Sequence, residues 1–165
     1  VSWRDFSARS DALAAALVAD GAQRGDRVAL YLRNCPEYLE LTYAAYKAAL
    51  TPVNTNYRYR PDELADLWSD ADAIAVAFHG AFTATVEQTR PKVAVRHWIW
   101  VDDGTNACPP WATAYDRLID EHLTADAHGP YVAPWGRSGD DVVMIYTGGT
   151  TGMPKGVMWR HQTSS

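Results

Sequence analysis

The sequence is poor in cysteine and in positive charge, and each shortage excludes a class of protein. Its two cysteines, Cys35 and Cys108, lie far apart without metal-ligand spacing, which argues against a disulfide scaffold or zinc cluster and favours free thiols in a reducing cytoplasm. The five histidines are scattered, so we expect no metal site. The net charge of −5 and the lack of any Lys/Arg block argue against nucleic-acid binding and against an anionic membrane surface.

Long apolar runs are also missing. The longest, Ala12–Ala19, is mostly alanine and lies between two aspartates, so it is too short to cross a bilayer. The sequence contains no secretory signal pattern, no repeat of 20–50 residues and no low-complexity tract. What is present is a chain of 165 residues with 47% hydrophobic content, enough for one globular domain with a core.

Apolar periodicity predicts helices and strands in alternation. Ser2 and Asp5 have capping-box spacing before the first helix, Gly21 is a suitable stop, and Pro36 and Pro61 fit first helical positions. Expected strands lie at 27–32, around 53, at 73–78, 98–101 and 142–146, and residues 124–141 read as a linker. The alternation predicts an α/β fold with a mixed, largely parallel sheet flanked by helices, in which ligands sit beyond the carboxyl ends of the strands.

One stretch near the C-terminus carries the chemistry. A short apolar run, Val142–Tyr146, enters a segment rich in glycine and threonine that ends in Pro154-Lys155-Gly156. Glycines let backbone N–H groups approach an anion closely, the threonines add hydroxyl donors, and Lys155 adds a charge. The composition favours polyphosphate binding, although a glycine-rich hairpin connection is the alternative. The segment does not fit the Walker A pattern, because Lys155 follows proline and precedes glycine.

The stretch Tyr146–Val157 resembles the signature phosphate loop of the adenylate-forming enzymes, in particular their acyl-CoA synthetase branch. Gly148 stands where that family usually has serine. Two further segments, Tyr46–Asn54 and Asn56–Leu64, are similar to other motifs of the branch, with Ala49 in place of a usual glycine. The alternation of tyrosine and arginine from Tyr57 to Arg60 is interpreted as cation–π packing at a helix entrance.

The resemblance implies a two-step ligase reaction. A carboxylate, most simply that of a fatty acid, attacks the α-phosphate of ATP to give an acyl-adenylate and pyrophosphate, and the thiol of coenzyme A then displaces AMP. Mg²⁺ would share the phosphate charge, and Lys155 is the implied catalytic residue. The residues implied to bind ATP phosphates are Thr147, Gly148, Gly149, Thr150, Thr151, Gly152 and Lys155.

The likeness also bears on domain organisation. We expect residues 1–161 to be the N-terminal portion of an AMP-binding domain that ends just after the phosphate loop, and residues 162–165 to be an unassigned tail. The chain begins with Val1 rather than Met, so we expect a piece of a longer cytoplasmic enzyme whose missing C-terminal region is its partner. The alternative is a non-catalytic remnant with at most weak polyphosphate binding.

The 165-residue chain alone is predicted to form no acyl-CoA from ATP, fatty acid and coenzyme A, because the family's adenine pocket, its metal-binding glutamate and its lid lysine have no counterpart in these residues. Thioester formation followed by chromatography checks this. Robust turnover by the isolated chain would show that the inventory of missing parts is wrong.

Overall fold

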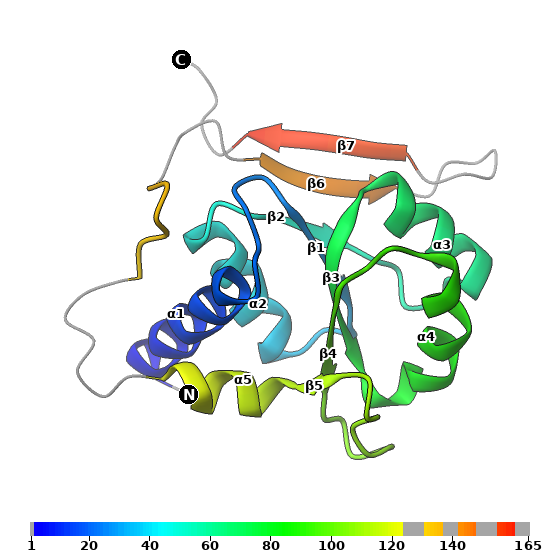
Figure 1. Ribbon diagram of the computed structural model, residues 1–165, viewed down its shortest axis with the longest axis horizontal. Coiled ribbons are helices and arrows are strands. Elements are labelled where there is room, and N and C mark those ends of the chain that lie inside the picture. The colour runs from blue at the N-terminus through cyan, green and yellow to red at the C-terminus, as the bar shows by residue number, and fades with distance from the viewer. Residues whose placement is uncertain (1, 124–130, 137–141, 148–154, 161–165) are drawn as a thin grey trace.

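The computed structural model describes the whole chain except residues 1, 124–130, 137–141, 148–154 and 161–165 (Figure 1). For residues 142–147 and 155–160 the description concerns the backbone. In chain order the elements are α1 (Trp3–Ala19), β1 (Arg27–Tyr31), α2 (Pro36–Lys47), β2 (Thr51–Asn54), α3 (Pro61–Asp70), β3 (Ala73–His79), η1 (Gly80–Phe82), α4 (Thr83–Thr89), η2 (Arg90–Lys92), β4 (His97–Val101), β5 (Thr113–Ala114), α5 (Tyr115–His122), β6 (Val142–Thr147) and β7 (Lys155–Arg160).

The described strands form one sheet in the order β5-β4-β3-β1-β2-β6-β7. Every neighbouring pair is parallel except β6 and β7, which pair antiparallel at one edge. The prediction of a mixed, largely parallel sheet is therefore confirmed. Strands β5 and β7 and the two 3₁₀ turns were not predicted.

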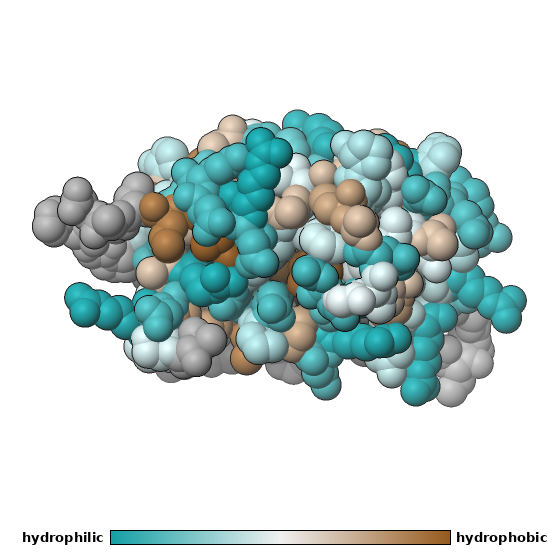
Figure 2. Space-filling view, turned by 90° about the horizontal axis from the view of Figure 1, so that it is seen from below, coloured by the Kyte–Doolittle hydropathy of each residue, from teal (hydrophilic) through white to brown (hydrophobic). Residues whose placement is uncertain are grey.

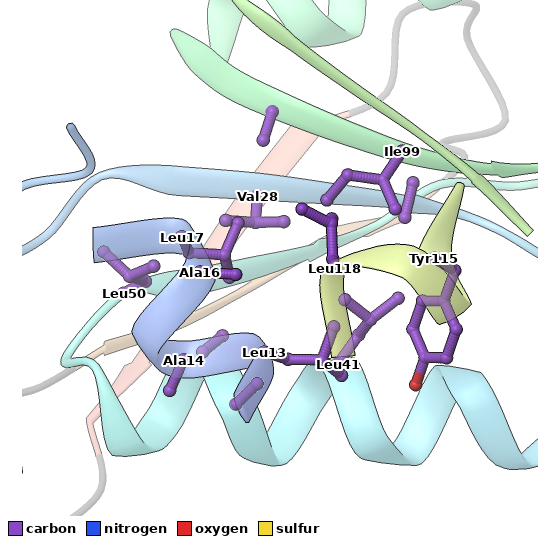
Figure 3. Packing of buried hydrophobic residues seen from close by; sticks show 14 of the residues in the cluster. Leu13, Ala14, Ala16, Leu17, Val28, Leu41, Leu50, Ile99, Tyr115 and Leu118 are labelled. Atoms are coloured by element: carbon purple, nitrogen blue, oxygen red, sulfur yellow. The ribbon is translucent and has the colours of Figure 1, made fainter. Parts of the chain in front are cut away.

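Helices cover both faces of the sheet, with α1, α2 and α5 on one side and α3 and α4 on the other (Figure 1). Alternate strand residues serve the two layers, because successive side chains of a strand point to opposite faces. In β1, Val28 and Leu30 pack with α1, α2 and α5, as Figure 3 shows for Val28. Ala29 and Tyr31 pack on the other side with α3. Burial on both faces explains why these strands read as continuous apolar runs.

The predicted helix signals are confirmed where they can be checked. The Ser2 hydroxyl accepts the backbone N–H of Asp5 at 3.1 Å, and Gly21 follows α1 with φ 101°, a left-handed conformation that suits glycine. Pro36 and Pro61 are the first residues of α2 and α3. At that position proline removes no helical hydrogen bond.

A buried carboxylate joins the three helices of the first layer. Glu40 of α2 is 2% exposed and accepts a hydrogen bond from Arg9 Nε of α1 at 2.9 Å. It also accepts the hydroxyl of Tyr115 of α5, whose oxygen is directed toward α2 in Figure 3. Burial, followed by the neighbouring Glu40 carboxylate, raises the pKa of Tyr115. A buried charge is costly without partners. Removing Arg9 or Tyr115 would therefore leave the Glu40 carboxylate with one partner fewer and lower the free energy of unfolding.

The segment predicted as a linker is partly fastened to the domain. Within it the structure describes residues 131–136, where Ala133 is buried and Trp135 donates its indole N–H to the carbonyl of Ala48 at 2.9 Å. In Figure 1 this segment is drawn in yellow-orange beside α1.

The face of the molecule seen from below is mostly hydrophilic and carries apolar patches (Figure 2). Seen from below, such patches gather toward the end of the molecule that carries α1 (Figure 2). At the start of α1, Trp3 is 72% exposed, and its ring stacks on Phe6 with centroids 5.4 Å apart. It also meets the edge of Tyr43 of α2 at 6.2 Å. These rings form an aromatic cluster on the outside of the first helical layer.

Two non-glycine residues adopt a left-handed conformation after a helix, and they provide a matched test. Asp72 follows α3 with φ 50° and is exposed, whereas Ala49 follows α2 with φ 55° and is 3% exposed. Asp72→Gly is predicted to raise the free energy of unfolding by about 0.5–1 kcal/mol, because relief of left-handed strain exceeds the added entropy of the unfolded chain.

Ala49→Gly serves as the comparison, with an expected change near zero, because the same relief is offset by the loss of a buried methyl group worth about 0.8 kcal/mol. Urea unfolding of both variants measures the difference. Equal effects at the two sites would contradict this account.

Candidate active site

A cleft opens at the carboxyl ends of β1 and β2. Its volume is about 720 Å³, and its walls come from the segments that follow these two strands. Residues with polar side chains that line it include Arg33, Asn34, Tyr38, Asn56, Tyr57 and Arg58. The cleft therefore lies where parallel sheets usually bind ligands, as the sequence predicted.

Two arginines meet the exposed ring of Tyr57 in this cleft. The guanidinium carbon of Arg33 lies 5.9 Å from the ring centroid of Tyr57 and 5.2 Å from that of Phe82. The corresponding distance from Arg58 to Tyr57 is 5.6 Å. Among the residues that the structure describes, neither arginine forms a salt bridge. Aromatic packing leaves the N–H edges of a guanidinium available, so the pair suits an anionic ligand.

A buried histidine supports the cleft from behind. His79, the last residue of β3, is 6% exposed, and its Nδ1 accepts the backbone N–H of Arg33 at 3.1 Å. This hydrogen bond places the proton of the neutral ring on Nε2. Burial lowers the pKa of His79, with Arg33 acting in the same direction and Asp103 and Glu37 opposing it. In its neutral form, His79 therefore holds the start of the loop that follows β1.

The turn after β3 leaves little room for a side chain at Gly80. A Cβ atom on Gly80 would lie 2.9 Å from Oδ1 of Asp103 and 3.0 Å from Nε1 of Trp100. The Asp103 side chain accepts the backbone N–H of Ala81 at 3.0 Å, while the amide of Asn106 donates to the carbonyl of Gly80 at 2.9 Å. These contacts tie the turn after β3 to the loop after β4.

The predicted phosphate-binding residues divide into two groups. Thr147 ends β6 and Lys155 begins β7, and the two are paired opposite one another. The other predicted residues lie outside the described part of the chain: Gly148, Gly149, Thr150, Thr151 and Gly152. The predicted strand before the loop is confirmed as β6, and β7 pairs with it antiparallel, so the two strands form a hairpin.

The hairpin stands beside the cleft. Strand β6 runs parallel to β2, with Val53 opposite Met144 and Asn54 opposite Ile145. The carboxyl ends of β2 and β6 therefore point to the same edge of the sheet. The chain leaves β2 into the cleft wall and leaves β6 at Thr147, so the cleft and the ends of the predicted loop share one edge.

Several features of the site were not singled out in the sequence. Arg33 and His79 were missed, and Arg58 was interpreted as packing only, which its contact with Tyr57 confirms in part. Their positions in the sequence could have indicated the site. Arg33 and Arg58 follow closely on the buried strands β1 and β2, and His79 is the last residue of β3.

The described residues hold no group of three His, Cys, Asp or Glu side chains that could bind a metal ion. Cys35 and Cys108 are free thiols there, and burial raises the pKa of Cys35 to about 11. In the same described part of the chain, no helix is long and apolar enough to cross a membrane.

The sheet, its two helical layers and the cleft at its carboxyl edge define an α/β ligand-binding domain. The family model for the AMP-binding enzyme matches residues 1–164, and the chain belongs to this family. A 3-oxocholest-4-en-26-oate–CoA ligase from Rhodococcus rhodochrous is 34% identical over 163 residues, which cover 98% of this chain and 29% of that protein.

Two further comparisons agree. A Mycobacterium tuberculosis enzyme, a medium/long-chain-fatty-acid–CoA and 3-oxocholest-4-en-26-oate–CoA ligase, is 34% identical over 165 residues, with 98% and 29% of the two chains covered. The crystal structure of the anthranilate CoA ligase AuaEII with anthranoyl-AMP matches with a TM-score of 0.84 at 22% identity, covering 96% of this chain and 29% of that one. The latter supports the fold alone. The chain spans about 29% of the length of these relatives.

The support that His79 gives to the cleft is predicted to weaken in acid. Because its folded-state pKa is lowered from 6.5, the unfolded chain takes up a proton that the folded chain resists. The contribution of His79 is therefore complete above pH 6.5 and is lost as the pH falls below it. His79→Asn keeps an acceptor near the Nδ1 position but does not titrate.

Urea unfolding of the wild-type chain and the His79→Asn variant between pH 7.5 and 5 measures this effect. The stability of the wild type relative to the variant should fall as the pH drops below 6.5. A difference that stays constant with pH would contradict a neutral, acceptor role for His79.

Proposed function

We propose that this chain is the N-terminal portion of an ATP-dependent acyl-CoA ligase, an acid–thiol ligase. Its family and its ligase relatives support this activity. In the first step a carboxylate oxygen attacks the α-phosphorus of ATP and the bond to pyrophosphate breaks. In the second step the sulfur of coenzyme A attacks the acyl carbon, and AMP leaves.

The observation that carries the proposal is the shared edge of the sheet. Thr147 and Lys155 bound the glycine- and threonine-rich segment, and both lie at the carboxyl end of β6, next to the cleft that follows β1 and β2. We assign phosphate binding to Thr147, Gly148, Gly149, Thr150, Thr151, Gly152 and Lys155. Their task is to position the triphosphate and to stabilise the charge that develops on the departing pyrophosphate.

The two arginines of the cleft add positive charge at the same edge of the sheet as Lys155. Arg33 and Arg58 face Tyr57 with their guanidinium groups and have no carboxylate partner among the described residues. We infer that they receive a phosphate group of one of the two nucleotide substrates, ATP or coenzyme A. Mg²⁺ would enter bound to the phosphates of ATP and lower their charge, and no described residue is assigned to it.

Two relatives support a substrate class. The Rhodococcus and Mycobacterium enzymes named above are ligases for medium- and long-chain fatty acids and for a steroid side-chain acid, and we propose a carboxylic acid of this apolar kind. We place the reaction in the cytoplasm, where the free thiols Cys35 and Cys108 would stay reduced. Residues 1–161 would serve as the first part of the AMP-binding domain, and the rest of the ligase would complete the pocket.

The role of Lys155 can be tested in the complete ligase. Lys155→Ala is expected to lower kcat for carboxylate-dependent pyrophosphate release by about 10²–10³-fold, because a charge aimed at the leaving group is lost. Lys92→Ala is the matched control, since Lys92 forms an exposed ion pair with Asp62 and such pairs contribute little.

Three results would separate the possibilities. Slow adenylation by the Lys155 variant with an unchanged unfolding midpoint supports the assignment. Wild-type rates for that variant would refute it. A reading frame that stops at Ser165, together with no pyrophosphate release, would favour the non-catalytic remnant.

A further inference from the structure

Residues 131–136 are fastened to the first helical layer at two points. The backbone N–H of Tyr131 donates to Oδ1 of Asp11 at 3.2 Å, and the same oxygen lies 2.6 Å from Nζ of Lys47. Four residues later, the indole N–H of Trp135 donates to the carbonyl of Ala48 at 2.9 Å. Between these points Ala133 is 3% exposed. The segment ends in a turn, where the N–H of Gly136 donates to the carbonyl of Ala133 at 2.9 Å.

The second anchor lies next to the strand that receives β6. Ala48 caps the C-terminal end of α2, and three residues further on the chain enters β2 at Thr51. Strand β2 is the parallel partner of β6. The Trp135 anchor and the pairing partner of β6 therefore belong to one short unit, the end of α2 and the strand that follows it. Figure 1 shows residues 131–136 on the side of the molecule that holds α1 and α2.

The pairing between β2 and β6 is short. Two residue pairs join the strands, Val53 with Met144 and Asn54 with Ile145. A short ladder specifies register weakly, and a slip by one residue would turn every side chain of β6 to the opposite face. An additional constraint on the start of β6 would therefore favour one register.

The two anchors supply such a constraint by shortening the connection to β6. Without them, residues 123–141 separate α5 from β6; with both, only residues 137–141 separate Gly136 from β6. Loop closure depends on length with an exponent near three halves, so the two anchors together raise the effective concentration of β6 at the edge of β2 by roughly sevenfold. With the Tyr131 anchor alone, residues 132–141 lie between anchor and strand, so the share that depends on Trp135 is roughly threefold.

We propose that Trp135 is a positioning residue that sets β6 against β2. Through β6 it determines where Thr147 and Lys155 stand at the carboxyl edge of the sheet. Its effect on catalysis rests on the proposed function of the loop between those two residues. Its effect on the strand does not.

Amide hydrogen exchange of the 165-residue chain tests the positioning directly. Trp135→Phe keeps an aromatic ring but removes the indole N–H, and Trp3→Phe is the same change at an exposed tryptophan whose indole has no hydrogen-bond partner among the described residues. We expect amides of β6 to exchange roughly threefold faster in Trp135→Phe, because the Tyr131 anchor remains, while amides of β1 are unchanged. The Trp3→Phe chain should match the wild type at both strands. Unchanged exchange in β6, or an equal increase in β1, would overturn the proposal.

The first anchor gives an independent pair of variants. Asp11→Asn retains the Oδ1 acceptor for the Tyr131 N–H and loses the ion pair with Lys47, whereas Asp11→Ala loses both. Faster exchange of β6 in Asp11→Ala than in Asp11→Asn is expected. If the amides of β6 exchange equally fast in the two variants, the attachment of residues 131–136 does not control the strand.

Kinetics of the complete ligase separate this inference from the proposed function. Trp135→Phe is expected to raise KM for ATP several-fold and to leave KM for the carboxylic acid unchanged. Faster exchange in β6 with an unchanged KM for ATP would uphold the positioning and count against phosphate binding by the loop. Unchanged exchange with an altered KM would count against the positioning alone.

Discussion

Burial of the central strands on both faces is the constraint from which the rest of this structure follows. β1 and β3 place alternate residues against two different helical layers, with Val28 and Ala77 on one side and Tyr31 and Phe78 on the other. Parallel strands joined by helical crossovers give this arrangement, and their carboxyl ends lie together at one edge of the sheet. That edge collects Arg33, Arg58 and the start of the glycine-rich segment, although these residues are far apart in sequence.

Most of the fold was predictable because its signals are local. Capping by Ser2, prolines at the starts of α2 and α3, and apolar runs for β1, β3 and β4 each depend on a few neighbouring residues. Strand β5 was missed because two residues, Thr113 and Ala114, show no periodicity. The fastening of residues 131–136 was also missed. A proline- and glycine-rich composition indicates a linker, whereas the hydrogen bond from Trp135 to Ala48 spans 87 positions and leaves no local trace.

In the candidate site, too, local sequence signals were predictable and contacts between residues distant in the chain were not. The strand that precedes the glycine- and threonine-rich segment is confirmed. Phosphate binding by that segment stays a prediction, because five of its residues lie outside the described part of the chain. The cleft was not predictable in detail, because Arg33 and Arg58 become neighbours only through the shared ring of Tyr57. The buried His79 is invisible to sequence patterns for a similar reason. Its partner is the backbone of Arg33, and a backbone group carries no residue signature.

The pairing of β2 with β6 also has a consequence for biosynthesis. Met144 is made 91 positions after Val53, its partner in the sheet, and at ordinary elongation speeds that interval lasts roughly 5–20 s. During this time β1, α2 and β2 can assemble from nearby contacts, while one side of β2 still offers unpaired peptide groups to any passing strand. The nascent chain is therefore most open to misassembly before its glycine-rich hairpin leaves the ribosome, and arrival of β6 closes that interval.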